Sequence, residues 1–478
     1  MAGRAERTER RERPSQGGMD RLIGWTTRHP VEAAAVGAGL GVTVGALLRR
    51  RMARPARGSD LGAARAPDAL GVFAGHEADW MLQRTLAYMN VGAAELGECL
   101  HVARRIDERD ADSWPREWAA LAARVDEMGH EALATGATAD ARRAFLRACN
   151  YYRAAEYGCT PSHPRFHSLW MASVAAFRKA APLFDPPVQA IEVPFEGSRL
   201  PGYFWRPDTS GTERPTLFVA GGNDDTIEED LFIIGPAAIE RGYNFFTFSY
   251  PGHRNAVHTD ARQVKRPDYE EPFAAALDVL ETLPGVDDRI ALMGFSGGGY
   301  VAPRVAIHDD RVTAVIANTP MIDYARVADA LLGPMVARVP GPVLDWAITR
   351  RLERNPLLRA YMEYGLWTAG YGHMSLYEWL TSDEAQREWA RFTITDDLHE
   401  ITCPALALVG AGEGEEMLEQ TRAFYAGVSS AQKRMHVFTL EQDGSHDHCM
   451  LDNLSRMHQV TFGWLNEVMP SAARRALV

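Results

Sequence analysis

The chain has 478 residues, of which 46% are hydrophobic and 9% aromatic. Such a composition supports a sizeable folded core and excludes a fibrous or wholly disordered protein. The formal net charge of −12 argues against a dedicated nucleic-acid binder. The five cysteines are scattered and include no CxxC pair, which excludes a disulfide scaffold or zinc ribbon and favours a reducing cytoplasm.

Residues 1–58 form a basic tail rich in Ala and Gly, with twelve arginines against five acidic residues. Within it, residues 31–48 are weakly apolar and just long enough to span a bilayer, but they include Glu32. Three arginines follow at 49–51, as at the cytoplasmic end of a membrane segment. We expect a cytoplasmic Ala/Gly-rich helix or tail, and an uncleaved membrane tether through residues 31–48 is the alternative.

The pattern of apolar residues divides the remaining chain into four parts. Residues 59–188 show helical spacing, which predicts a helical N-terminal domain. Short apolar runs then alternate with helix-length segments, and this predicts a mostly parallel α/β sheet built from residues 189–320 and 401–478. Residues 321–400, rich in Trp, Tyr, Met and Leu, predict a helical lid inserted into that sheet. The expected strands are 191–195, 201–205, 216–220, 244–249, 289–293, 312–317 and 405–409.

A G-x-S-x-G motif, Gly-Phe-Ser-Gly-Gly, occupies residues 294–298. It follows the expected strand 289–293 directly and precedes an expected helix at 300–307. A strand–turn–helix places the serine on a strained elbow with its hydroxyl exposed above the sheet. Ser296 is therefore the predicted nucleophile, and an ordinary tight turn is the alternative.

A serine nucleophile that attacks a carbonyl needs fixed N–H donors for the developing oxyanion. The amide of Gly297, directly after the serine, is one predicted donor. The second is expected in the loop after strand 216–220, from Gly222 or Asn223. A plain glycine turn is the alternative interpretation of that loop.

The segment 443–449 reads Asp-Gly-Ser-His-Asp-His-Cys and supplies the predicted general base. Ligands so close in sequence cannot all converge on one ion, so we expect no metal and one of two histidines, His446 or His448, as base. The acid should follow strand 405–409, where Glu413, Glu415 and Glu416 stand. Asp323, after the preceding strand, is the competitor, and a solvated acidic loop is the alternative.

From about Trp80 to its end, the sequence resembles bacterial and fungal α/β-hydrolases that carry a helical N-terminal domain. This group includes 2,6-dihydroxypseudooxynicotine hydrolase, the fungal hydrolases that shorten polyketide pigment precursors and, more distantly, FrsA-like esterases. The segments that carry the resemblance are 112–114, 117–118, 148–153, 155–156, 221–222, 228–229, 266–270, 286–294, 403–404 and 448–449.

The resemblance implies Ser296 as nucleophile, His448 as base and Glu413 as the acid. The family usually has Asp where Glu413 stands, and two further departures lie close to the predicted pocket. A Pro-Gly-x-Gly after the fourth strand is Pro-Gly-His-Arg at 251–254 here, and the elbow at 296–299 has Gly in place of Phe. The identity of the substrate is therefore the property that the resemblance to the family predicts least well.

The resemblance also implies hydrolysis of a carbon–carbon bond beside a carbonyl in a small aromatic or polyketide-like molecule. Hydrolysis of a carboxylic ester is the enzymatic alternative, and a catalytically idle, membrane-tethered binding protein is an alternative from another class. We expect a small-molecule substrate, no nucleic-acid partner, no metal and no organic cofactor; a homodimer stays open. The substrate is expected in a closed cavity between the helical domain, the lid and the sheet.

Overall fold

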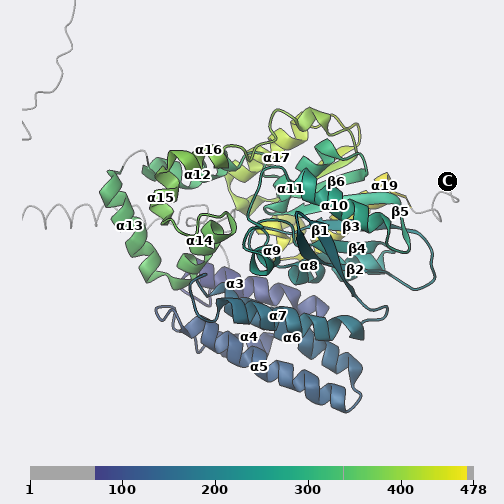
Figure 1. The fold of residues 1–478 in the computed structure, drawn as a ribbon, viewed down its shortest axis with the longest axis horizontal. Helices are drawn as coiled ribbons and strands as arrows, with labels where there is room; N and C mark the ends of the chain where they lie inside the picture. Colours follow the sequence, from purple (N-terminus) through teal and green to yellow (C-terminus); the bar gives the residue numbers. More distant parts are fainter. Residues whose placement is uncertain (1–69, 337–338, 471–478) are drawn as a thin grey trace, which may run out of the picture. The chain divides into compact units, whose positions relative to one another are not determined.

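The central sheet of the computed structural model has the order β1-β2-β4-β3-β5-β6-β7-β8 (Figure 1). The structure describes residues 70–336 and 339–470. β1, β2 and β4 pair antiparallel, and every pairing from β4 through β3 to β8 is parallel. The predicted mostly parallel α/β sheet is confirmed. Its strands are β1 (Gln189–Phe195), β2 (Ser198–Trp205), β3 (Arg214–Ala220), β4 (Asn244–Phe248), β5 (Val286–Phe295), β6 (Val312–Asn318), β7 (Ala405–Gly410) and β8 (Lys433–Phe438).

The central strands are apolar on both faces because helices cover both faces. Along β3, Leu217 and Val219 belong to one buried cluster, whereas Phe218 belongs to a second cluster on the opposite face. The first cluster includes helices α8 (Ile227–Glu240) and α19 (Leu454–Val468). The second includes α10 (Glu270–Glu281), α11 (Gly298–His308) and α17 (Glu415–Gly427).

Strand β8 was not among the expected strands. It begins with Lys433 and Arg434, and five of its six residues are partly or fully exposed. An edge strand has one neighbour and one open side, so it lacks the continuous apolar run that identified the central strands.

Helices precede the sheet, as predicted for the N-terminal region. α5, α6 and α7 pack against one another beside α3 and α4 (Figure 1). Their buried side chains are continuous with the first core cluster, so this region and one face of the sheet share a core. The helices are α3 (His76–Ala87), α4 (Leu96–Ala103), α5 (Ser113–Ala134), α6 (Thr138–Tyr157) and α7 (Phe166–Ala180).

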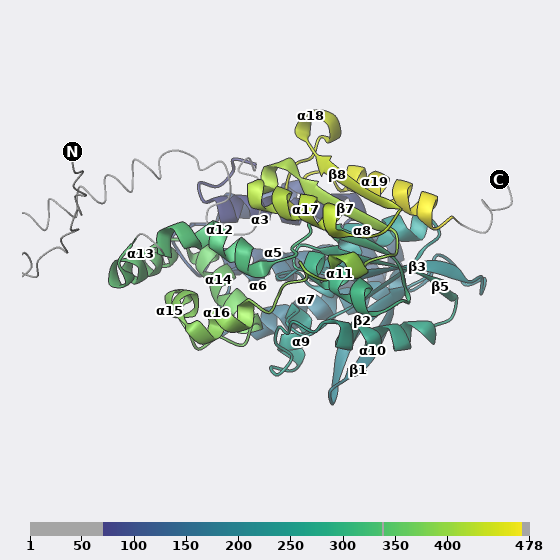
Figure 2. The same cartoon turned by 90° about the horizontal axis from the view of Figure 1, so that it is seen from above.

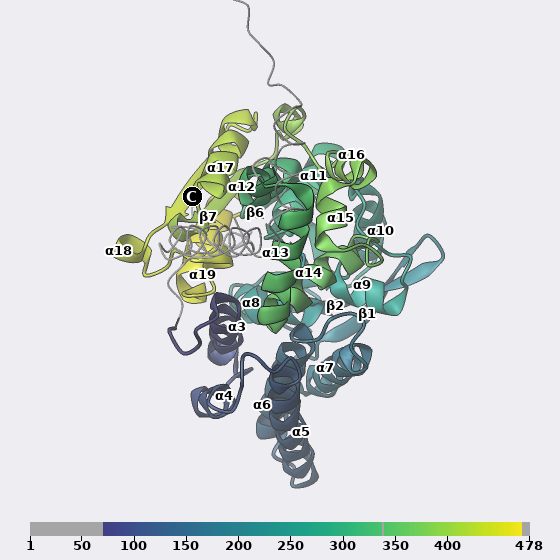
Figure 3. The same ribbon diagram turned by 90° about the vertical axis from the view of Figure 1, so that its left-hand side faces the viewer.

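A second set of helices lies between β6 and β7, where the sequence predicts a helical insertion. Figure 2 shows these helices gathered at one end of the sheet, and Figure 3 views the molecule from that end. They are α12 (Tyr324–Val336), α13 (Gly341–Arg354), α14 (Pro356–Thr368), α15 (Leu376–Thr381) and α16 (Asp383–Trp389). We call residues 321–400 the insertion.

The described residues belong to one compact unit, and the division into separate domains stays a prediction. The proposed tether at residues 31–48 lies outside the described residues. Among the helices that the structure describes, none combines the length and the apolarity needed to cross a bilayer.

Candidate active site

Ser296 stands on a sharp turn between β5 and α11. Its φ is +52°, in the left-handed region that non-glycine residues rarely occupy. Its N–H donates to the carbonyl of Asn318 at 2.6 Å, and its own carbonyl accepts from the N–H of Gly299 at 2.8 Å. The strained elbow predicted from the motif is therefore present, held by backbone hydrogen bonds on both sides.

The glycines of the motif are required by crowding. A Cβ atom at Gly294 would collide with the carbonyl of Gly298, which lies on the next turn. A Cβ atom at Gly298 would collide with the carbonyls of Ala220 and Gly221 at the end of β3. Because these neighbours are backbone atoms, no side-chain rotation relieves the clash.

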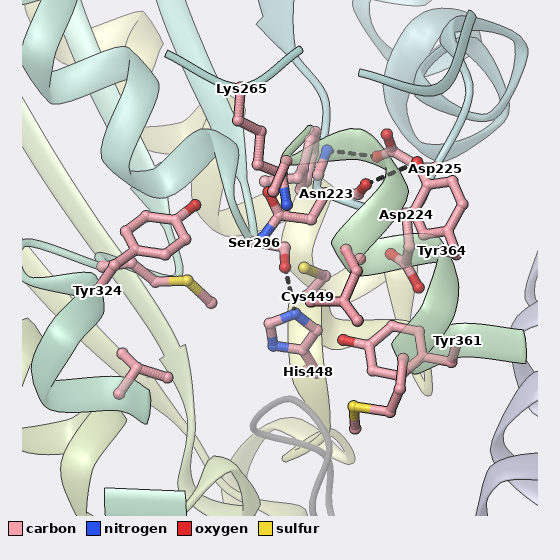
Figure 4. A pocket seen from close by; sticks show the side chains of 18 of the residues that line it. Asn223, Asp224, Asp225, Lys265, Ser296, Tyr324, Tyr361, Tyr364, His448 and Cys449 are labelled. Carbon is pink, nitrogen blue, oxygen red and sulfur yellow. Dashed lines mark hydrogen bonds between the residues drawn. The ribbon is translucent and has the colours of Figure 1, made fainter. Parts of the chain in front are cut away.

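Three predicted side chains meet at this elbow, and we call them the Ser296 triplet: Ser296, His448 and Glu413. His448 Nε2 lies 2.8 Å from Ser296 Oγ, a contact drawn in Figure 4. His448 Nδ1 lies 2.6 Å from Glu413 Oε2. Glu413 directly follows β7 and His448 follows β8, so parallel strands bring residues separated by up to 152 positions to one edge of the sheet.

The carboxylate of Glu413 is fixed on both oxygens. The N–H of Gly410 donates to Oε1 at 2.7 Å, and the hydroxyl of Thr319 donates to Oε2 at 2.7 Å. A carboxylate held in this way orients the imidazole and favours a proton on Nδ1, which leaves Nε2 free to accept the serine proton.

The electrostatic surroundings of His448 act in opposite directions. Burial of the ring disfavours its charged form and lowers the pKa, whereas Cys449 and Glu413 beside it raise the pKa. The raising effects prevail, so the pKa of His448 lies well above its ordinary value. A more basic imidazole is a stronger proton acceptor from Ser296.

The competing acids lie away from His448. Asp323 Oδ1 accepts the N–H of Arg326, and the Asp323 carbonyl accepts from the side chain of Gln420. The exposed Glu415 pairs with Arg422, and Glu416 pairs with Arg326. The backbone N–H of His446, the other candidate base, donates to Asp452. The geometry therefore selects His448 and Glu413 as the neighbours of Ser296.

The two predicted amides of the β3 loop have different surroundings. The N–H of Gly222 donates to Asp225 Oδ2 at 2.6 Å, so it is already occupied. Within residues 70–336 and 339–470, the amides of Gly297 and Asn223 donate to no protein group. The Asn223 side chain fills the space beside Gly297. This leaves Gly297 and Asn223 as the pair of free N–H donors beside the serine.

Two tyrosines hold the residues that carry these amides. The Tyr364 hydroxyl of α14 donates to the carbonyl of Asn223 at 2.9 Å. The Tyr324 hydroxyl of α12 donates to the carbonyl of Gly297 at 3.1 Å. Both tyrosines belong to the insertion, which therefore fixes the candidate oxyanion donors as well as covering them.

The Ser296 triplet opens into a cavity of about 220 Å³. Its walls come from the helical region, the sheet loops and the insertion, as the sequence predicts. They are largely apolar, which suits a compact organic substrate. The residues that line the cavity include Trp80, Arg84, Asn223, Asp224, Asp225, Lys265, Ser296, Met321, Tyr324, Tyr361, Tyr364, Leu366, Trp379, Trp389 and His448.

Helix α3 contacts the site through a buried arginine that sequence reasoning missed. Arg84 binds both oxygens of Glu229 at 2.9 Å and Asp224 at 3.0 Å. Tyr88, one turn later, donates to Glu229 at 2.8 Å. Glu229 lies in one of the segments that carry the family resemblance, and this was the available signal. The ion pair links the helical region to the loop that carries Asn223.

The same helix also holds the loop of His448. Trp80 Nε1 and Gln83 Nε2 donate to Asp447 Oδ2 at 3.0 and 2.6 Å. Asp447 Oδ1 in turn accepts the N–H of His448 at 2.7 Å. α3 thus contacts two of the loops that build the site, although its partners lie more than 360 residues away in one case.

A second serine–histidine–carboxylate group lies behind the β3 loop, and we call it the Ser249 triplet: Ser249, His253 and Asp225. His253 Nε2 lies 2.6 Å from Asp225 Oδ1, and His253 Nδ1 lies 3.1 Å from Ser249 Oγ. Ser249 Oγ also accepts the N–H of Ala256 at 2.6 Å. His253 occupies the variable position of the family's Pro-Gly-x-Gly, directly before Arg254, where the sequence departs from that pattern. Through Asp225, which accepts the N–H of Gly222, His253 holds the loop after β3.

Known proteins are similar to this chain in sequence and in fold. Residues 217–460 match the model of the alpha/beta hydrolase family. The Fusarium hydrolase LUC6 is 31% identical over 399 residues, which cover 78% of this chain and 92% of that protein. The 20-hydroxy-prefusarin hydrolase FUS2 of Gibberella moniliformis is 31% identical over 316 residues, covering 63% of this chain and 75% of FUS2.

Among solved structures, 2,6-dihydroxy-pseudo-oxynicotine hydrolase superposes with a TM-score of 0.63 at 21% identity, covering 80% of this chain and 95% of that one. At this identity the likeness concerns the fold, and it extends over the helical region as well as the sheet. The extent of the family match and of the relatives together shows that the chain belongs to the alpha/beta hydrolase family.

Proposed function

We propose that this hydrolase uses Ser296 as a nucleophile to cleave a carbon–carbon bond beside a ketone in a small aromatic or polyketide-like compound. The observation that carries the proposal is the Ser296 triplet, which opens into an apolar cavity beside the free amides of Gly297 and Asn223. A nucleophile, an oriented base and an oxyanion site are the parts that acyl chemistry requires.

In the first step, Ser296 Oγ attacks the ketone carbon while His448 Nε2 takes the hydroxyl proton. The carbonyl oxygen becomes an oxyanion, and the amides of Gly297 and Asn223 stabilise it. The carboxylate of Glu413, beside Nδ1, stabilises the imidazolium that forms. The raised pKa of His448 favours this proton transfer.

In the second step, the carbon–carbon bond breaks and the oxyanion collapses to an acyl-enzyme. The electron pair leaves with the departing carbon as an enolate, and His448 returns the proton to that carbon. Water then attacks the acyl-enzyme with His448 again as base, which releases a carboxylic acid and restores Ser296. The departing carbon must therefore carry a second carbonyl group, so that it can leave as an enolate. A 1,3-diketone meets this requirement.

The support for a ketone over other carbonyl substrates comes from the family resemblance. Relatives such as FUS2, a hydrolase of 20-hydroxy-prefusarin by name, support a small organic substrate. The same triplet can also hydrolyse a carboxylic ester, since an alkoxide leaves more easily than a carbanion. Ester hydrolysis is the second candidate, and it needs no further group in the site.

The experiment compares the purified protein on aryl 1,3-diketones and on p-nitrophenyl esters, with products identified by mass spectrometry. Cleavage of a diketone into an acid and a ketone, absent in Ser296→Ala, supports the proposal. Hydrolysis of esters without any diketone cleavage would assign the second candidate. Diketone cleavage that persists in Ser296→Ala would overturn the nucleophile.

A further inference from the structure

Lys265 is one of three lysines in the chain, and it lines the same cavity as Ser296. It lies in the loop between α9 (Arg254–Thr259) and α10. Figure 4 shows its side chain running toward the loop of Asn223, on the side of the pocket that holds Ser296. No sequence motif includes Lys265, and it has no part in the proposed cleavage at Ser296.

The backbone of Lys265 is held from two sides. Its N–H donates at 2.9 Å to the carbonyl of Thr368, at the end of α14. On the other side, the N–H of Gly252 donates at 2.7 Å to the carbonyl of Gln263. Gly252 has a φ of +83°, and the Cγ and backbone of Lys265 fill the space where its side chain would stand. The ammonium therefore extends from a fixed position in the wall.

The other charged side chains of this wall already have protein partners. They are Arg84 with Asp224 and Glu229, Asp225 with His253, and His448 with Glu413. For Lys265, no carboxylate of residues 70–336 or 339–470 lies within ion-pair distance. Its Nζ lies 5.8 Å from the ring centroid of Trp389, an aromatic contact that stabilises a cation only weakly.

Within the described residues, the ammonium of Lys265 lacks an ion-pair partner that would compensate for its loss of hydration. Burial lowers the pKa of Lys265 to about 8, and the charge of Asp224 acts in the opposite direction. The side chain is thus still mostly protonated at neutral pH. Lys265 is half-buried. A partly desolvated charge without an ion-pair partner is unfavourable, and an arriving anion would compensate it.

We infer that Lys265 binds an anionic oxygen of the substrate, so that the carbonyl compound cleaved at Ser296 carries a carboxylate, phenolate or enolate group. This inference rests on the proposed function, because it concerns the substrate of the same cavity. The surrounding wall is apolar, with Met321, Leu366 and Trp379 among its residues. A substrate with an apolar body and one anionic oxygen complements both the wall and the ammonium.

Binding measurements test the inference without turnover. In the full-length Ser296→Ala protein, isothermal titration calorimetry compares 3-phenylpropionate, 4-phenylbutyrate and 5-phenylvalerate with their primary amides. We expect at least one acid to bind ten times more tightly than its amide. The three chain lengths place the carboxylate at three different distances from the phenyl ring, so that one of them can reach Lys265 while the ring contacts the apolar wall. Dinitrophenolate and dinitrobenzene form a matching pair for the phenolate case.

Variants at position 265 then assign the preference. Lys265→Met and the near-isosteric Lys265→Gln should reduce the acid-to-amide preference to less than twofold, whereas Lys265→Arg should retain part of it. Lys433→Met, at the start of β8 and outside the cavity wall, should bind like its parent. Circular dichroism of each variant verifies folding, and the conservative Gln and Arg variants keep the test valid when Met does not fold.

Equal binding of every acid and its neutral partner, or a preference that survives in both neutral variants, would overturn the inference. The carboxylate and phenolate pairs distinguish the two sources of the anionic oxygen. Failure of the proposed function gives another result, namely absence of diketone cleavage by the wild-type protein. Because the binding test uses a protein that lacks Ser296, its outcome does not depend on that turnover.

Discussion

The Ser296 triplet and the Ser249 triplet contain the same three kinds of side chain but differ in what surrounds the serine. Ser296 stands at φ +52° on the cavity wall, beside amides that donate to no described protein group. Ser249 is fully buried, lies outside the cavity wall and accepts the N–H of Ala256. The two histidines also contact their serines through different ring nitrogens. His448 contacts Ser296 through Nε2, whereas His253 contacts Ser249 through Nδ1.

Under the proposed function, this difference explains why a serine with histidine and carboxylate neighbours is not always a nucleophile. A reactive serine needs space for a carbonyl carbon and N–H donors for its oxyanion, and only Ser296 has both among the two. In the Ser249 triplet, hydrogen bonds instead hold Asp225, which accepts the N–H of Gly222 in the loop after β3. One triplet is placed to react, and the other is placed to position the loop.

Replacing each serine should give the largest contrast. Ser296→Ala should lower kcat by four or more orders of magnitude, because the members of a catalytic triad act as a unit. Ser249→Ala should change kcat by less than about tenfold, since it removes only the buried hydrogen bonds to His253 and Ala256. Steady-state kinetics on the best diketone or ester measures both, with circular dichroism as the folding control. An equal loss in both variants would contradict the distinction.

The acid of the Ser296 triplet should matter less than the serine. Glu413→Gln should lower kcat by about 10²- to 10⁴-fold, because the amide no longer stabilises the imidazolium. The matched control is Asp323→Asn, which lies after the neighbouring strand β6 and should keep kcat within about twofold. Full activity of Glu413→Gln, with loss in the Asp323 variant, would move the acid to the other strand.

The pH dependence of kcat/KM should report the ionisation of His448. The base must be neutral to accept the serine proton, so kcat/KM should fall about tenfold per pH unit below the raised pKa of His448. Activity should therefore be lost on acidification from a higher pH than an ordinary histidine would give. A neutral substrate is used so that Lys265 does not contribute. His446→Ala should leave the profile unchanged; a profile that shifts with this variant would indicate the wrong histidine.

A smaller effect is expected from the histidine of the Ser249 triplet. His253→Gln removes the ring that holds Asp225 and should lower kcat by about three- to tenfold, with KM changed less. The reason is that a loosened Asn223 amide weakens transition-state stabilisation more than substrate binding. Steady-state kinetics measures the split. A loss in thermal stability without any change in kcat would assign His253 a structural role alone.

The elements that the sequence predicted well are those with a strong local pattern. β3, β5, β6 and β7 each contain a short apolar run, and the glycine-rich turn after β5 carries the G-x-S-x-G motif. β8 is a polar edge strand, so its pattern was too weak to detect. Glu413, which lies beside His448 in the structure, was selected because it follows a strand in the required order and because the family resemblance favours it.

The contacts that sequence analysis missed depend on residues far apart in the chain. Arg84 meets a carboxylate 145 positions later, and Trp80 meets one 367 positions later. No local periodicity encodes such pairs, because they arise when helix α3 packs against the loops of the sheet. Lys265 likewise has no sequence signal, since its importance lies in the absence of a described carboxylate partner in the folded wall.

The most direct test of the distinction between the two triplets is covalent labelling with a fluorophosphonate, which reacts with activated serines independently of the natural substrate. The native protein should acquire a single adduct in intact-mass spectrometry, and peptide mapping should place it on Ser296. Ser249→Ala should label like the native protein, and Ser296→Ala should not label. An adduct on Ser249, or undiminished labelling of Ser296→Ala, would contradict the account.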